Sequence, residues 1–148
     1  MIAIRTIEKE LSELKKANEH GSFVYASSSE TFSSVCKKHF GQIKRIDKHG
    51  VYIVRQKSTN HVLYIGKSGT INNQGVFEKQ DIPERLANIK GRISSNEWFK
   101  ILLSEKGVVV IEYLFLNKTP ISPAVVESVL LQAYLNEYGR LPYRNNEL

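Results

Sequence analysis

Two tyrosines in strand-like runs are the first residues of this 148-residue chain whose types and spacing suggest chemistry. Tyr52 lies in the β-branched and aromatic run 50–54, and Tyr64 lies in the run 61–65. The polar turn between them predicts a hairpin. A turn with an odd number of residues, ending at a left-handed Asn60, would place both phenols on one sheet face, and an even turn would separate them. Adjacent phenols could position a phosphate and a water, although strand tyrosines more often only pack.

Glu127 lies on the last expected helix, which runs from Ser122 to Gly139. At 100° per residue it falls roughly 140° from the centre of the polar stripe on that helix. It shares its face with Leu131, Tyr134 and Tyr138. A carboxylate among such neighbours is costly to bury unless it is paired, hydrogen-bonded or bound to a cation. The alternative is a solvated glutamate stabilised by the helix macrodipole.

Two cations lie between these positions. Lys67 follows Gly66 directly after the second strand, where a glycine permits a close backbone approach, but the spacing of a Walker loop is absent. Arg85 lies one turn into a helix that begins near Pro83. A solvated helix arginine is the more common interpretation of Arg85 taken by itself.

Composition restricts the class of protein. Apolar residues make up 41% and charged residues 24%, which is typical of one globular domain. The single cysteine excludes an internal disulfide framework, and the four histidines show no metal-ligand spacing. No apolar run approaches a membrane span and no signal-peptide segment is evident, so we expect a soluble, cytoplasmic protein with no membrane partner.

Basic residues outnumber acidic ones by 21 to 15, giving a net charge of +6. This excess permits nucleic acid as a partner without proving it. A basic cluster precedes the hairpin and is a candidate for contacts with a duplex backbone, although a solvated surface is the more common explanation. Its members are Lys37, Lys38, Lys44, Arg45 and Lys48.

The elements that must position these residues follow from periodicity and caps. Amphipathic or capped helices are expected over about 5–18, 28–40, 83–90, 94–107 and 122–139. Strands are expected over about 23–26, 50–54, 61–65 and 108–115, with a polar loop over 66–81. The run 108–115 is almost continuously apolar and should be central in its sheet. The order of elements predicts an α+β layer structure.

Taken together, these residues resemble the GIY-YIG nuclease family. Gly50-Val51-Tyr52 is followed, after eleven residues, by Tyr64-Ile65-Gly66. The resemblance continues in order through Lys67, Arg85-Leu86, Glu127, and Asn145 shortly after Pro142. It covers about residues 50–145, roughly two-thirds of the chain.

The resemblance implies a small antiparallel sheet of about three strands flanked by helices, and metal-dependent phosphodiester hydrolysis. One Mg²⁺ (or Mn²⁺) would bind Glu127. Tyr52 would activate the water, with Lys67 or the metal lowering a phenol pKa that is ordinarily near 10. Tyr64 would orient the phosphate or the water. Arg85 would neutralise developing charge, and Asn145 would brace the site.

The resemblance also implies a division of the chain. Residues 46–148 would form the nuclease domain, and residues 1–45, which match nothing familiar, would be a helical extension packed on its core. The segment from Gly66 to Arg85 is longer than the usual family spacing, which makes Arg92 the alternative to Arg85 and a candidate for contacts with nucleic acid.

Three functions follow as hypotheses. The first is a Mg²⁺-dependent endonuclease acting on DNA, with RNA as a further option and with a homodimer as one way to cut both strands. The second is a non-catalytic nucleic-acid-binding domain of the same fold. The third is a small interaction protein in which the tyrosines and Glu127 only pack.

Overall fold

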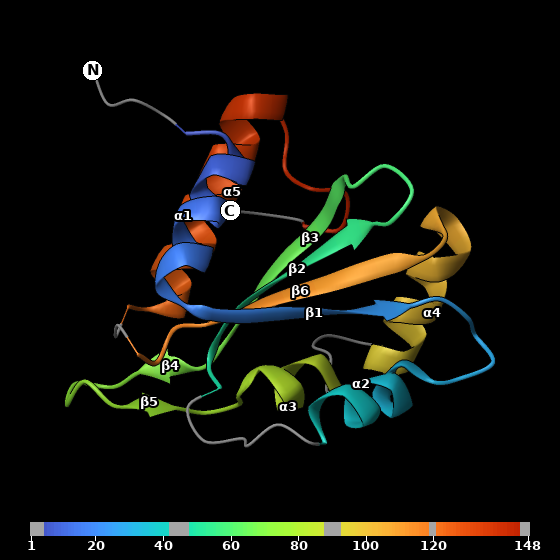
Figure 1. The fold of residues 1–148 in the computed structure, drawn as a ribbon, viewed down its shortest axis with the longest axis horizontal. Helices are drawn as coiled ribbons and strands as arrows, with labels where there is room; N and C mark the ends of the chain where they lie inside the picture. Colours follow the sequence, from blue (N-terminus) through green and yellow to red (C-terminus); the bar gives the residue numbers. More distant parts are fainter. Residues whose placement is uncertain (1–4, 42–47, 88–92, 119–120, 146–148) are drawn as a thin grey trace.

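The computed structural model describes residues 5–41, 48–87, 93–118 and 121–145. A four-stranded antiparallel sheet has the order β1-β6-β2-β3. Its strands are β1 (Glu19–Tyr25), β6 (Val109–Phe115), β2 (Gly50–Gln56) and β3 (Val62–Ser68). One face is covered by α1 (Ile7–Ala17) and α5 (Pro123–Tyr138), as Figure 1 shows. The other face is covered by α2 (Phe32–Phe40), α3 (Ile82–Ala87) and α4 (Ser95–Lys106).

The α+β class is confirmed, but the expectation of about three strands is wrong. β1 pairs with β6 along its whole length, from Glu19 opposite Phe115 to Tyr25 opposite Val109. Only the apolar end of β1 was predicted, because its first four residues are polar or glycine and lie on a largely exposed edge strand. The first 41 residues therefore contribute a strand as well as helices. The expected boundary between residues 45 and 46 lies outside the described part of the chain.

The central position predicted for the apolar run 108–115 is confirmed, since β6 lies between β1 and β2. Its side chains alternate between two cores. Ile111, Tyr113 and Phe115 join the cluster under α2, α3 and α4. Leu114 joins the cluster under α1 and α5. A strand that is buried on both faces has apolar residues at nearly every position, and this is the pattern seen in residues 108–115.

Capping residues place the helix ends close to the predicted ones. Ser94 accepts a hydrogen bond from the Glu97 N–H at the start of α4, and Gly139 ends α5 in the left-handed conformation. For α2 the predicted cap was wrong, because Thr31 rather than Ser28 or Ser29 caps the first turn. The predicted end of the third helix, beyond residue 87, lies outside the described residues.

The segment predicted as a polar loop contains a second, small sheet. β4 (Thr70–Ile71) pairs with β5 (Phe77–Glu78) in an antiparallel hairpin at one end of the main sheet, beside α3 (Figure 1). Two-residue strands give too short a pattern for periodicity to reveal. No helix within the described ranges is long and apolar enough to cross a membrane.

Candidate active site

The hairpin of β2 and β3 places Tyr52 and Tyr64 on the same face of the sheet. Their ring centroids lie 6.0 Å apart; the Tyr52 ring belongs to the core under α2, α3 and α4, and the partly buried Tyr64 ring packs against that core. The left-handed Asn60 is confirmed, with φ of 63°. Of the two turn lengths considered, the structure has the even one, because the Gln56 N–H bonds the His61 carbonyl across four turn residues.

A β-bulge in β3 explains why Tyr52 and Tyr64 share one face although the turn between their strands has an even number of residues. The register changes from Val54 opposite Tyr64 to Arg55 opposite Val62, so Leu63 is the extra residue on β3. One extra residue reverses the alternation of every side chain beyond it. Without this bulge the four-residue turn would have sent the two phenols to opposite faces.

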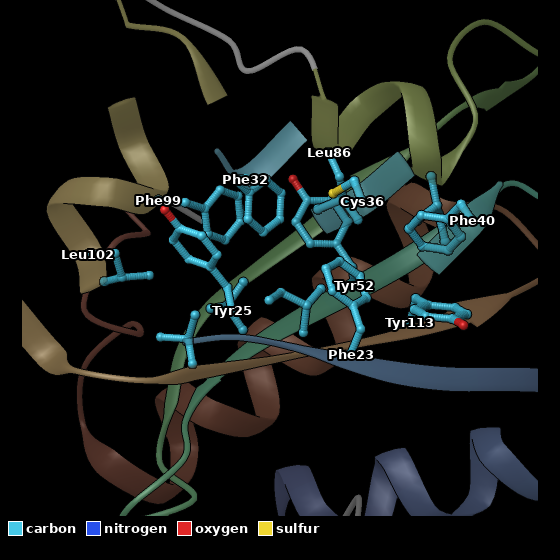
Figure 2. Packing of buried hydrophobic residues seen from close by; sticks show 14 of the residues in the cluster. Phe23, Tyr25, Phe32, Cys36, Phe40, Tyr52, Leu86, Phe99, Leu102 and Tyr113 are labelled. Carbon is cyan, nitrogen blue, oxygen red and sulfur yellow. The ribbon is translucent and has the colours of Figure 1, made fainter. Parts of the chain in front are cut away.

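Glycine at position 66 makes room for the two rings. A Cβ at Gly66 would lie 2.4 Å from Cζ of Tyr52 and 2.8 Å from Cε1 of Tyr64. Tyr52 lies directly opposite Gly66 in the strand register, with its ring across the glycine. The same ring is only 5% exposed and packs with Cys36 and Leu86 in the core, as seen in Figure 2. The last residue of the second motif thus has a steric reason to be glycine.

The C-terminal segment fastens the outer edge of β3. Asn145 accepts a hydrogen bond from the Ile65 N–H and donates one to the Ile65 carbonyl, both at 2.9 Å. The Arg144 N–H bonds the carbonyl of Leu63, the bulge residue, also at 2.9 Å. The Asn145 side chain therefore imitates a neighbouring strand. Asn145 holds the backbone after Tyr64 and Arg144 holds the backbone before it, and none of these bonds reaches the phenols.

Trp98 packs against Tyr64, a contact that was not predicted from the sequence. Its ring on α4 meets the Tyr64 ring edge-to-face at a centroid distance of 5.1 Å. The Arg144 guanidinium lies 5.2 Å from the centroid of the Trp98 ring. The one available signal was the chain's single tryptophan on an expected helix, and nothing in its spacing connects that helix with β3.

The charged residues predicted for the site surround the edge of β3. Arg85 on α3 lies close enough to lower the pKa of Tyr52, Tyr64 and Glu127. Lys67 on β3 also lowers the pKa of Glu127. Burial outweighs both cations, and the net effect raises the pKa of the Glu127 carboxyl above its ordinary value. The five residues come from β2, β3, α3 and α5, and each lies close enough to another of the set for their charges to influence one another.

Burial also raises the pKa of both phenols. For Tyr52 the shift is large, the neighbouring Tyr64 adds to it, and Arg85 opposes it. For Tyr64 burial again dominates, and the Glu127 carboxylate adds to the shift. Lys67 or the metal was expected to lower the pKa of Tyr52, and among the described residues Arg85 is the cation that does so. Both phenols are therefore protonated at neutral pH in the protein alone.

Glu127 provides one carboxylate that a divalent cation fits. It is half-buried, and no hydrogen-bond donor of the described residues contacts its oxygens. Burial raises its pKa by more than Lys67 and Arg85 lower it, so a further positive charge would favour the ionised carboxylate. Within the described ranges, no group of three or more His, Cys, Asp or Glu residues gathers around a common point. This donor set suits Mg²⁺ or Mn²⁺ held mostly by water and phosphate oxygens.

The predicted nucleic-acid contacts receive one correction. Lys48 is 9% exposed, its ammonium lies 3.1 Å from both Glu19 carboxylate oxygens, and it stacks over the Phe115 ring at 4.5 Å. Its charge is used inside the fold, so we remove it from the expected phosphate contacts. Lys44, Arg45 and Arg92 lie outside the described residues.

Comparison with protein-family models, with curated proteins and with solved structures found no match in any of the three. The interpretation of the site therefore depends on its own geometry.

Proposed function

We propose that this protein is a divalent-metal-dependent endonuclease of the GIY-YIG type that hydrolyses phosphodiester bonds in DNA. The observation that carries the proposal is the convergence of Tyr52, Tyr64, Lys67, Arg85 and Glu127 at the edge of β3. These residues come from four helices and strands, and a packing role alone would not require two cations and a carboxylate beside two phenols. Four specific structural devices keep the phenols in place: a bulge at Leu63, a glycine at 66, and the contacts of Asn145 and Trp98.

In the proposed reaction, Arg85 binds the scissile phosphate through its planar guanidinium and neutralises charge as the transition state forms. Lys67 adds a second positive charge on the side of Glu127. The Tyr64 hydroxyl donates a hydrogen bond to a phosphate oxygen and so orients the phosphate. Tyr52 releases its phenol proton to solvent, holds the attacking water, and takes a proton from it as the water oxygen bonds to phosphorus and the bond from phosphorus to the leaving oxygen breaks. A cation bound by Glu127 would polarise the phosphate, stabilise the leaving oxygen and favour the ionised form of Tyr52.

DNA is the substrate that we propose because the chain carries a net charge of +6 and the site presents two cations at its rim. RNA offers the same phosphodiester, and the described contacts do not distinguish a 2′-hydroxyl. The described residues of one chain form one such site, so the proposed reaction is a cut in a single strand. Cleavage of both strands would need two copies of the chain or a second binding event.

A second candidate is a nucleic-acid-binding domain without catalysis, and the burial of Tyr52 favours it. At 5% exposure the phenol has little access to water in the protein alone. The binding candidate requires the cations but neither the ionisation of Tyr52 nor a cation on Glu127.

A plasmid-nicking assay in Mg²⁺ and in EDTA separates the two candidates, using the wild type, Tyr52→Phe and Glu127→Ala. The nuclease proposal predicts nicking by the wild type in Mg²⁺ only, and its loss in both variants. Equal nicking by all three proteins would point to a contaminant and contradict the proposal. Retarded but uncut plasmid with the wild type in Mg²⁺ would favour the binding domain.

A further inference from the structure

The hairpin of β4 and β5 borders a cleft that the site residues share. The cleft has a volume of about 380 Å³, at the lower end of the range for small-ligand sites. Lys67 and Arg85 line it from the candidate active site, and Thr70 and Lys79 line it from the two sides of the hairpin. We refer to the space bordered by these four residues as the hairpin cleft.

Contacts with His49, just before β2, hold the β4–β5 hairpin against the main sheet. The His49 ring stacks on Phe77 at a centroid distance of 5.6 Å, and its Nε2 lies 3.2 Å from the Lys79 carbonyl. Asn117, which follows β6, accepts a hydrogen bond from the His49 N–H at 2.9 Å. A Cβ at Gly69 would lie 2.5 Å from the same imidazole, so the turn into β4 is built closely around it.

Lys79 has an unusual backbone that points to a positional role. Its φ is 68°, a left-handed conformation that costs a residue with a Cβ roughly 1–2 kcal/mol. The hydrogen-bonding contact of its carbonyl with His49 maintains this conformation. Glycine would remove the strain, but it would also remove the exposed ammonium from the hairpin cleft.

The cations of the hairpin cleft form no close ion pair among the described residues. Within the described ranges, no carboxylate lies within 4.0 Å of the Lys67, Lys79 or Arg85 cations. The Thr70 hydroxyl oxygen is buried and has no hydrogen-bond partner among the same residues. Three cations around one cleft match the chemistry of a phosphate group.

We propose that the hairpin cleft binds the phosphate adjacent to the scissile one, with Lys79 as its principal contact. The inference rests on the proposed nuclease function, since Lys67 and Arg85 line both the cleft and the candidate active site. A phosphate in the hairpin cleft therefore lies next to the reacting phosphate along one strand. The substrate is then a polynucleotide, because a phosphodiester with a single phosphate cannot use Lys79.

The first test measures binding of a fluorescently labelled DNA duplex in EDTA, by anisotropy, between about 50 and 200 mM salt. Each phosphate contact contributes about 0.9 to the slope of log affinity against log salt concentration. Lys79→Gln should reduce that slope by about this amount, and Lys79→Arg should restore it. Lys57→Gln is the matched control, because Lys57 is an exposed lysine in the turn at the other end of β2 and β3 (Figure 1).

The second test compares substrates under cleavage conditions. Lys79→Gln should raise KM for the duplex several-fold, and leave kcat/KM for bis(p-nitrophenyl) phosphate, which has one phosphate, unchanged. An unchanged salt slope in Lys79→Gln, or an equal reduction of the slope in Lys57→Gln, would refute phosphate binding in the hairpin cleft while leaving the nuclease proposal intact. A wild type that binds with the Lys79-dependent slope but never cuts would refute the nuclease and retain the cleft as a phosphate-binding site.

Discussion

Gly66→Ala is the perturbation whose effect can best be worked out from the structure. The added methyl would lie 2.4 Å from Cζ of Tyr52 and 2.6 Å from its hydroxyl oxygen. Ordinary contacts begin near 3.4 Å, so the ring must move by about 1 Å. Because the ring is 5% exposed and packed in the core, this movement displaces neighbours as well.

Two consequences of different size follow from that movement. Overpacking of a core costs about 1–3 kcal/mol in the free energy of unfolding. A 1 Å misplacement of a reacting group costs about 10²-fold in rate. The account therefore predicts a folded Gly66→Ala protein with modestly reduced stability and a nicking rate about 10²-fold lower.

Gly139→Ala provides a control of matched stability. Gly139 ends α5 with φ of 72°, and a Cβ there would meet no atom within 4 Å. Alanine in that conformation costs roughly 1–2 kcal/mol without touching the site. Urea unfolding and Mg²⁺-dependent plasmid nicking should be measured for both variants. Wild-type nicking by Gly66→Ala, or an equal rate loss in Gly139→Ala, would refute the steric reasoning about the two phenols.

Four further outcomes follow from the same contacts. Glu127→Gln should unfold at an unchanged or higher temperature near pH 7, because the raised pKa of Glu127 means that its ionised form destabilises the folded state. Mg²⁺ should raise the melting temperature of the wild type but not of this variant. Asn145→Ala should lose about 1–3 kcal/mol of stability in urea unfolding, since it removes two hydrogen bonds to Ile65, and Asn145→Asp should also lose stability because its carboxylate cannot donate to the Ile65 carbonyl. Above pH 10, the free energy of unfolding of Tyr52→Phe should fall less steeply with pH than that of the wild type. The reason is that the Tyr52 phenol loses its proton there in the unfolded state but not in the folded state. Parallel alkaline unfolding curves for the two proteins would contradict this prediction. Lys48→Gln should cost about 1 kcal/mol of stability yet leave the salt slope of duplex binding unchanged.

Much of the fold could be predicted because burial leaves a strong mark on sequence. The apolar run 108–115 indicated an interior strand, and caps such as Ser94 and Gly139 indicated helix ends. β1 was mostly missed because an edge strand needs few apolar residues. β4 and β5 were missed because two paired residues leave no period to detect.

The site was predictable as a set of residue types and only partly as geometry. Tyr52, Tyr64 and Glu127 could be selected from strand runs and helix angles, but the bulge at Leu63 leaves no signal in the residues themselves. Such a bulge decides which face each tyrosine occupies. Trp98 and Lys79 approach the site from segments whose positions depend on the tertiary packing, so sequence spacing could not identify them.

The most direct test of the central claim is whether the site acts as one unit. Single-turnover nicking rates should be measured in Mg²⁺ for Tyr52→Phe, for Glu127→Gln and for the double variant. Residues that work together on one phosphate show strongly non-additive losses, so the account predicts a double variant about as slow as the slower single variant. Losses that multiply, or a single variant that nicks at the wild-type rate, would contradict a shared active site at the edge of β3.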